Sequence, residues 1–349
     1  MSRLRALLAT LRIANAPSVV GNLWLGFMLG AYQWGLSLVR SLWGGSPLAH
    51  DTYLIVGDGP ATLLPLSALI ASALGLYFAG NLANDWYDRH WDARHRPERA
   101  LPRALFPAWS YLLAAVLLGG LSCVLAASIS PWCLAVAAIL CGLIALYTFL
   151  HKRTRWAVIP MGLCRAALYA LGFVASTPDW DTLTGTPAYS FASPAAAGTV
   201  LVPGAFLATH ALGLLVYIAG LSLAARYEAT EHPPHGMVVL SRAMLFLPLA
   251  AMSSWWMPYY PLMASLALVP FALWLALSLT RLRKPVPRLV SALLAGIPLI
   301  DFIAALPLAA ALSLPDQGLH QQPLLLATVL VPLAAFGAAL LLQKVAPAT

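Results

Sequence analysis

Charged side chains are scarce in this chain of 349 residues: they make up 9% of it, whereas hydrophobic residues make up 61%. This composition excludes an ordinary soluble domain, in which about a quarter of the residues are charged. Hydrophilic stretches long enough for a second domain are also lacking, so residues 1–349 are predicted to form a single integral-membrane domain.

Cysteine is scarce as well, with four residues in the chain. All four lie in apolar segments and lack the spacing of a metal site, which argues against a disulfide scaffold or a cysteine-bound metal. They are expected to be packing residues. These cysteines are Cys123, Cys133, Cys141 and Cys164.

Long apolar runs, by contrast, recur along the whole chain. Each has about the 20 residues that a helix needs to cross a bilayer. The sequence therefore predicts an all-α, polytopic transmembrane bundle of about nine to ten helices, surrounded by membrane lipid. The ten candidate spans are residues 17–36, 61–84, 108–128, 131–150, 157–175, 199–224, 237–255, 258–279, 289–313 and 323–343.

Basic residues gather on one side of this predicted topology. With the N-terminus inside and spans that alternate, eighteen of the twenty Lys and Arg residues share a side; Arg40 lies opposite and Arg165 lies within a span. This asymmetry predicts that the basic side is cytoplasmic, as in a bacterial plasma membrane. The formal net charge of +8 is then explained by orientation and phosphate binding, and no nucleic-acid partner is predicted.

Carboxylates cluster in the segment NLANDWYDRHWDARHRPERALPR. On a helix, Asp85, Asp88 and Asp92 fall within roughly 60° of one another, and Asn81 and Asn84 widen the arc to roughly 100°. Carboxylates so close together require a neutralising cation. Oxygen ligands without sulfur or imidazole suit Mg²⁺, which in turn holds phosphate oxygens. The alternative is a solvated, charged helix end beside the membrane.

The spacing of this cluster favours the first interpretation. The sequence NDWYDRHWD, which begins at Asn84, resembles NDxxDxxxD, the first aspartate-rich motif of the UbiA family of membrane prenyltransferases. The sequence RPERALP, which begins at Arg96, resembles the RPxRPxP stretch that follows that motif in the family. The resemblance implies a bundle of nine helices, so one of the ten predicted spans would be peripheral or additional.

The resemblance also implies an activity. It is the Mg²⁺-dependent transfer of an isoprenyl group from a prenyl diphosphate to a lipophilic acceptor, such as an aromatic acid or a polar lipid head group. The implied metal ligands include Asn84, Asp85, Asp88 and Asp92, with Asn81 beside them. Asp85 and Asp88 are the implied catalytic carboxylates.

A second group of charges follows the sixth predicted span, where UbiA proteins carry another aspartate-rich motif. Here the aspartates are absent, and the sequence reads AARYEATEH. Glu228 and Glu231 are predicted to replace them as metal ligands, and Arg226 to contact the diphosphate or pair with an acid. Arg226 lies nearly opposite Glu228 on an ideal helix, so all three converge only with a local break. The AR-x-E sequence resembles a divergent, EboC-like branch; an ordinary charged helix end is the alternative.

A third group, YTFLHKR, closes the fourth predicted span. It resembles the Tyr followed by Lys-Arg of UbiA proteins. The resemblance implies that Lys152 contacts the diphosphate and that Tyr147 lies at the site. Positive-inside anchoring alone would also explain Lys152.

Two charged residues lie deeper in predicted spans. Arg165 and Asp301 occur in MGLCRAALYALG and AGIPLIDFIAAL, where an isolated charge costs at least a few kcal/mol. Both are therefore site candidates, and Arg165 is grouped with Asn81, Asn84 and Tyr147 as a predicted cofactor-binding residue. Pairing with each other or with backbone carbonyls is the alternative. His210 is expected to be a hydrogen-bonded core histidine.

Three rival functions remain open at this point. A UbiA-like enzyme could cyclise the prenyl chain, and a scaffold that has lost the second motif could be inactive. A membrane transporter is the third; it would be expected to place polar groups along several spans, whereas here nearly all charge lies at one membrane face.

Overall fold

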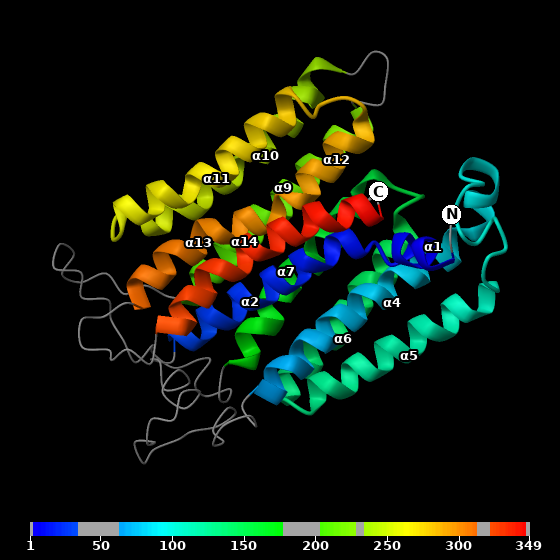
Figure 1. Ribbon diagram of the computed structural model, residues 1–349, viewed down its shortest axis with the longest axis horizontal. Helices are drawn as coiled ribbons and strands as arrows, with labels where there is room; N and C mark the ends of the chain where they lie inside the picture. The colour runs from blue at the N-terminus through cyan, green and yellow to red at the C-terminus, as the bar shows by residue number, and fades with distance from the viewer. Residues whose placement is uncertain (1–2, 34–62, 177–202, 228–233, 313–321, 347–349) are drawn as a thin grey trace.

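The computed structural model describes residues 3–33, 63–176, 203–227, 234–312 and 322–346, and all regular structure in these segments is helical. The helices pack side by side into an elongated bundle (Figure 1). Their order is α1 (Arg3–Thr10), α2 (Ala16–Gln33), α4 (Leu63–His95), α5 (Ala108–Ala127), α6 (Pro131–Leu150), α7 (Val158–Ala175), α9 (Pro203–Tyr227), α10 (His235–Trp256), α11 (Pro261–Thr280), α12 (Val286–Ala295), α13 (Ile297–Leu312) and α14 (Gln322–Val345).

The predicted all-α membrane architecture is confirmed. Within the described segments, nine helical stretches are long and apolar enough to cross a membrane. One of them, Val286–Ala311, combines α12 and α13. The first predicted span corresponds to α2, an apolar helix of 18 residues outside those nine. The chain is thus a multi-pass integral membrane protein.

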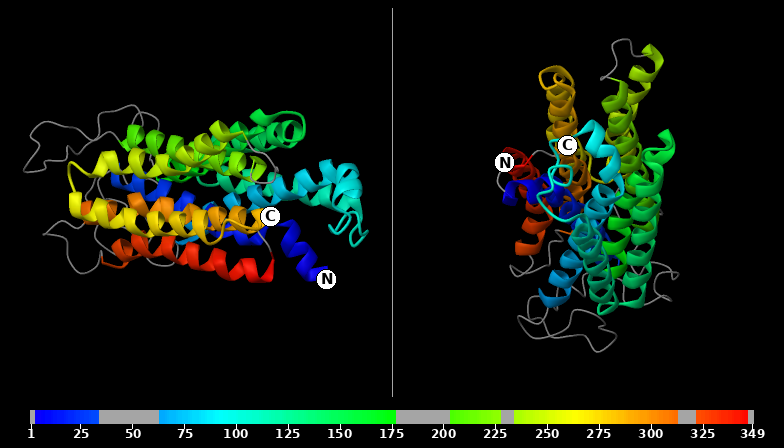
Figure 2. Two further views of the ribbon diagram at one scale, coloured as in Figure 1. Left: turned by 90° about the horizontal axis from the view of Figure 1, so that it is seen from above. Right: turned by 90° about the vertical axis from the view of Figure 1, so that its right-hand side faces the viewer.

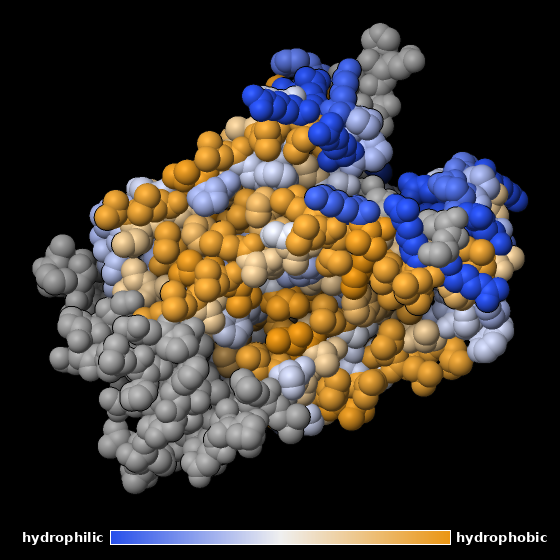
Figure 3. Space-filling view, viewed as in Figure 1, coloured by the Kyte–Doolittle hydropathy of each residue, from blue (hydrophilic) through white to orange (hydrophobic). Residues whose placement is uncertain are grey.

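The helices differ in how much of their surface faces lipid. The Val286–Ala311 span is 78% buried inside the protein, whereas α5 and α6 are each 22% buried. Leucine and valine side chains cover the outward faces, including Val116 and Leu117 on α5. Figure 3 shows this apolar surface along the length of the bundle, with hydrophilic side chains gathered toward one end. Such a surface suits a lipid environment.

Two inner helices, α2 and α7, approach each other closely through glycine. A Cβ atom added at Gly26 would lie 2.1 Å from the carbonyl oxygen of Tyr169, and one at Gly172 would lie 2.1 Å from that of Leu23. Only glycine permits this backbone contact, a common device between membrane helices. The contact brings polar residues of α2 and α7 together in the interior.

The longest helix, α4, carries the aspartate-rich motif at its C-terminal end. Its 33 residues span about 50 Å, more than a bilayer core requires. In Figure 2, the end of α4 and the turn that follows it extend beyond the neighbouring helices. The motif is therefore placed at one end of the bundle.

Candidate active site

The polar residues of α4 lie together on one buried face, as their helical spacing predicted. Asn81, Asn84, Asp85, Asp88 and Asp92 are each between 2% and 8% exposed. Buried carboxylates require partners, because an isolated ionised carboxylate in an apolar interior is very costly.

Arginines supply partners for two of the three aspartates. Arg12 and Arg99 each approach the Oδ1 atom of Asp85, with Nη2 and Nη1 respectively at 3.4 Å. Arg99 Nη1 also lies 2.8 Å from Asp92 Oδ2. Arg99 therefore bridges the carboxylates of Asp85 and Asp92, both of which are buried.

The third aspartate, Asp88, has its partners in the turn that follows α6. The His151 ring Nε2 lies 2.7 Å from Asp88 Oδ2, and Lys152 Nζ lies 3.5 Å from the same oxygen. Lys152 Nζ also lies 3.4 Å from the centre of the Trp91 ring, a cation–π contact. Burial lowers the pKa of Lys152, and the carboxylates of Asp88 and Asp92 partly oppose this shift. Protein cations thus neutralise the aspartate cluster in this structure.

Arg12 occupies an unusual backbone position. It precedes a short 3₁₀ turn, Ile13–Asn15, with φ 47° and ψ 48°, in the left-handed region that costs a non-glycine residue roughly 1–3 kcal/mol. Three hydrogen bonds hold it there: Arg12 Nη1 donates to Asn81 Oδ1 at 2.7 Å, Tyr77 OH donates to the Arg12 carbonyl at 2.9 Å, and Asn81 Nδ2 donates to the Leu11 carbonyl at 2.9 Å. Burial lowers the pKa of Arg12, but the nearby acidic groups, led by Asp85, together outweigh burial, so the pKa of Arg12 is raised.

Two buried oxygens of the cluster have no hydrogen-bond partner in the described segments. They are Asn84 Oδ1 and Asp92 Oδ1. Among the residues described, no group of three or more His, Cys, Asp or Glu side chains is close enough to hold a metal alone. Mg²⁺, however, binds through one or two carboxylates together with substrate phosphates and water. The oxygen-only donors and the unpartnered Asn84 oxygen fit such an ion.

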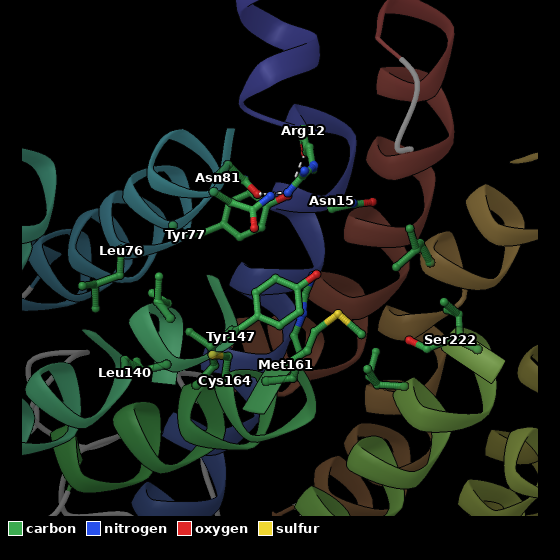
Figure 4. Close-up of a pocket in the computed structure, with 18 of the residues that line it drawn as sticks. Arg12, Asn15, Leu76, Tyr77, Asn81, Leu140, Tyr147, Met161, Cys164 and Ser222 are labelled. Carbon is green, nitrogen blue, oxygen red and sulfur yellow. Dashed lines mark hydrogen bonds between the residues drawn. The ribbon is translucent and has the colours of Figure 1, made fainter. Parts of the chain in front are cut away.

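A cavity of about 410 Å³ opens beside the cluster. Arg12, Asn81 and Asn84 form part of its polar end, whereas Leu140 and Leu294 belong to its mainly apolar wall. Figure 4 shows Arg12 hydrogen-bonded to Asn81 at one edge, with Tyr147 extending into the space and Met161 below it. The cavity can hold an apolar chain with a charged group at one end.

The remaining predicted site residues have different placements. Tyr147 and Arg165 line the cavity. Arg226 is exposed at the end of α9 and forms no ion pair with another described residue, although Ala225 beside it lines the cavity. Glu228 and Glu231 lie outside the described residues.

The deep charges do not pair with each other directly. Arg165 Nη1 donates to Ser18 Oγ at 2.8 Å and to Asn22 Oδ1 at 3.4 Å. Asp301, fully buried, accepts hydrogen bonds from Asn22 Nδ2 at 3.0 and 2.9 Å and from Tyr169 OH at 2.5 Å. Asn22 therefore links the two charges, so neither a direct pair nor backbone carbonyls explain them.

The expectation for His210 is wrong. Neither ring nitrogen of His210 forms a hydrogen bond within the described segments, although the residue is only 1% exposed. Its Nε2 atom lies 3.9 Å from Asp301 Oδ1, beyond hydrogen-bond distance. The ring instead packs against Phe206 and Tyr169.

Sequence reasoning missed three basic partners of the aspartates. Arg99 and His151 lie within the RPERALP and YTFLHKR stretches, so those motifs carried a signal that was not used. Arg12 belongs to no such stretch. Its role depends on a contact with a residue 69 positions away, Asn81.

The sequence profile of the UbiA prenyltransferase family matches residues 37–303. No curated protein sequence gives a significant match.

Two solved structures of low sequence identity, with TM-scores above 0.5, share the fold. A structure described as digeranylgeranylglyceryl phosphate synthase is 16% identical, with a TM-score of 0.53; the alignment covers 87% of this chain and 98% of that one. An apo UbiA homologue from Aeropyrum pernix K1 is 16% identical, with a TM-score of 0.55 and coverage of 82% and 94%. A UbiA homologue from Archaeoglobus fulgidus bound to GPP and Mg²⁺ is 12% identical, with a TM-score of 0.40 and coverage of 97% and 99%.

Proposed function

Because this chain belongs to the UbiA prenyltransferase family, we propose that it transfers the isoprenyl group of an allylic prenyl diphosphate to a lipophilic acceptor in a Mg²⁺-dependent reaction. The observation that carries the proposal is the position of the buried Asp85 and Asp88 carboxylates, paired with basic side chains beside a mainly apolar cavity. A prenyl diphosphate has matching chemistry, with an anionic head and an apolar tail.

The basic side chains around the aspartates would bind the diphosphate head. Lys152, Arg12 and Arg99 can turn from carboxylate oxygens to phosphate oxygens, for which guanidinium groups are well suited. Asn84, Asp85 and Asp88 would then hold Mg²⁺, which supplies positive charge that stabilises the diphosphate as a leaving group. Asp92 and Asn81 keep the surrounding side chains in position.

The reaction balances without an external oxidant or reductant. The bond between C1 of the prenyl group and the diphosphate oxygen breaks, and both electrons leave with diphosphate. The acceptor nucleophile forms a new bond to C1 and releases a proton. The apolar wall of the cavity excludes water from the allylic cation, and the rings of Tyr77 and Tyr147 can stabilise it.

The second motif belongs to the same proposal. Glu228 and Glu231 would provide further metal ligands, and Arg226 would contact the diphosphate from the end of α9. The basic ends of α4 and α9 would face the cytoplasm, as the distribution of Lys and Arg predicts. A membrane-impermeant thiol reagent should then label Arg96→Cys only after inverted or opened membranes are prepared.

Release of diphosphate tests the proposed function. Purified protein in lipid nanodiscs is incubated with geranyl, farnesyl or geranylgeranyl diphosphate, with Mg²⁺ or with EDTA, and the prenyl products are identified by mass spectrometry. We expect Mg²⁺-dependent release that increases when an acceptor is present. Release with a cyclic product and no acceptor would indicate cyclisation, and absence of release from every donor would indicate an inactive scaffold or a transporter.

A further inference from the structure

We propose that Arg165 forms a second anion-binding site in the cavity, which takes a carboxylate or phosphate group of the acceptor, and that Asp301 positions Arg165 through Asn22. The inference rests on the proposed function, because a transfer reaction requires a second substrate beside the prenyl donor.

Arg165 is incompletely paired. Its guanidinium lines the cavity, but its two hydrogen bonds go to neutral oxygens, those of Ser18 and Asn22, and both come from Nη1. Within the described segments, Nε and Nη2 donate to no side chain or carbonyl, and neither is fully enclosed. A guanidinium within an apolar bundle, with two free donors side by side, has the geometry that binds a carboxylate or phosphate.

Arg165 is also separated from the aspartate cluster. Arg165 lies beside Tyr77, with its Cζ atom 5.9 Å from the ring centre. Tyr77 precedes Asp85 on α4 by eight residues, which is about 12 Å along a helix axis. A diphosphate held at Asp85 and Asp88 would be too short to reach Arg165 as well. The space between the two sites is where an acceptor must lie if its nucleophile is to reach C1 of the donor.

A hydrogen-bond network holds Arg165 on the side away from its free donors. Asp301 accepts two hydrogen bonds from Asn22 Nδ2 and one from Tyr169 OH. These bonds fix the orientation of the Asn22 amide, so that its Oδ1 atom faces Arg165. Asp301 makes no direct hydrogen bond to the guanidinium, so it leaves the free donors of Arg165 available. Tyr169 and Asn22 are on helices α7 and α2, whose backbones are in direct contact at Gly26.

This arrangement would select acceptors by charge. An acceptor with a carboxylate or phosphate gains charge-assisted hydrogen bonds from Arg165, whereas a neutral analogue leaves the free donors of this half-buried guanidinium without an anionic partner. Asp301 is a positioning residue in this scheme, because it acts on the ligand only through Asn22 and Arg165.

Binding of small aromatic probes to the purified full-length protein tests the inference. The probes are benzoate, phenyl phosphate and the neutral benzamide, and inorganic diphosphate with Mg²⁺ reports on the aspartate cluster. Affinities are measured by calorimetry for the parent protein and for Arg165→Gln, Arg165→Lys, Asp301→Asn and Arg99→Gln. Thermal melting shows which variants remain folded, and the conservative Arg165→Lys keeps the charge if Arg165→Gln fails to fold.

We expect at least one anionic probe to bind roughly tenfold or more tightly than benzamide in the parent, a preference that Arg165→Gln abolishes and Arg165→Lys partly retains. Asp301→Asn should reduce the preference severalfold while diphosphate affinity stays within about twofold. Arg99→Gln should instead weaken diphosphate binding and leave the preference for the anionic probe unchanged. Preference for carboxylate or for phosphate would identify which group the acceptor carries.

Two results would overturn the inference. One is equal binding of benzamide and both anions to the parent. The other is an equal loss of diphosphate and benzoate affinity in Arg165→Gln, which would assign Arg165 to the donor. Failure of diphosphate binding with an intact, Arg165-dependent preference would instead contradict the proposed function alone.

Discussion

Two groups of buried carboxylates differ in the side chains that neutralise them. The α4 aspartates at the end of the bundle are paired with basic residues: Asp85 with two arginines, and Asp88 with a histidine and a lysine. Asp301, in the interior, accepts its hydrogen bonds from an amide and a phenol, those of Asn22 and Tyr169. The two groups therefore have partners of different charge.

The difference indicates different roles. Arg99 and Lys152 are partly exposed, with 22% and 30% of their side chains accessible, so they can turn from a carboxylate to an incoming phosphate. Asn22 and Tyr169 are completely buried on helices in direct backbone contact, so they cannot exchange partners without unpacking the interior. Removal of an α4 aspartate should therefore affect mainly activity, whereas damage to the Asp301 network should affect mainly stability.

The largest expected effect is on turnover by Asp85→Asn and Asp88→Asn. Each removes a metal ligand and a carboxylate charge but keeps the size of the side chain, so we expect a loss of about a hundredfold or more in Mg²⁺-dependent diphosphate release. The melting temperature should change less than in Asn22→Ala, because Arg12, Arg99 and Lys152 are partly exposed and water can replace the lost carboxylate. Arg153→Gln, at a neighbouring basic residue that contacts Tyr87 and Phe149, is the matched control and should retain turnover.

The second prediction concerns Asn22→Ala. This change deprives Asp301 of two hydrogen bonds in a fully buried position, so it should lower the free energy of unfolding by about 3 kcal/mol. Thermal unfolding in detergent, followed by circular dichroism, measures the effect. If Asn22→Ala melts like the parent while Asp85→Asn melts far below it, the assignment of roles to the two groups is reversed.

The third prediction concerns the helix contact that supports the interior network. Gly26→Ala would place Cβ 2.1 Å from the Tyr169 carbonyl, so α2 and α7 must separate, at a cost of about 2 kcal/mol. Gly119→Ala on α5 is the control, because a Cβ there meets nothing within 4 Å among the described residues. A lower melting temperature only for Gly26→Ala is the expected result; equal melting of both variants would show that the contact is not tight.

The smallest expected effect concerns Lys152 and pH. Burial lowers the pKa of Lys152, so its ammonium loses its proton at a lower pH than an ordinary lysine does. Diphosphate binding should therefore weaken as the pH rises through this lowered pKa. Lys152→Gln should weaken donor binding about tenfold at neutral pH, and Lys152→Arg should restore binding at alkaline pH. If the parent and Lys152→Arg lose diphosphate affinity equally as the pH rises, Lys152 does not bind the diphosphate.

The sequence was sufficient to predict the helices and the buried face of α4, because both follow from local patterns. Apolar runs of the right length identify spans, and the spacing of Asp85, Asp88 and Asp92 places them on one face whatever the rest of the chain does. The break between α12 and α13 at Gly296 was not predicted, since the apolar run continues through it.

The partners of the aspartates could not be predicted to the same extent. Arg12 and Asn81 are 69 residues apart, and Asn22 and Asp301 are 279 residues apart, so these contacts depend on how the helices pack. The like charges of the motif suggested a metal, and Mg²⁺ remains part of the proposal. The additional contacts of the aspartates with Arg99 and His151 follow only from the folded structure.

Titration of geranyl diphosphate into the purified protein tests the central claim most directly, since it measures ligand exchange at the α4 aspartates without an acceptor. Calorimetry is performed with Mg²⁺ and with EDTA on the parent, Asp88→Asn and Arg153→Gln. The account predicts Mg²⁺-dependent binding to the parent and to Arg153→Gln, and binding at least about tenfold weaker to Asp88→Asn. Equal affinities for all three proteins, unchanged by EDTA, would contradict it.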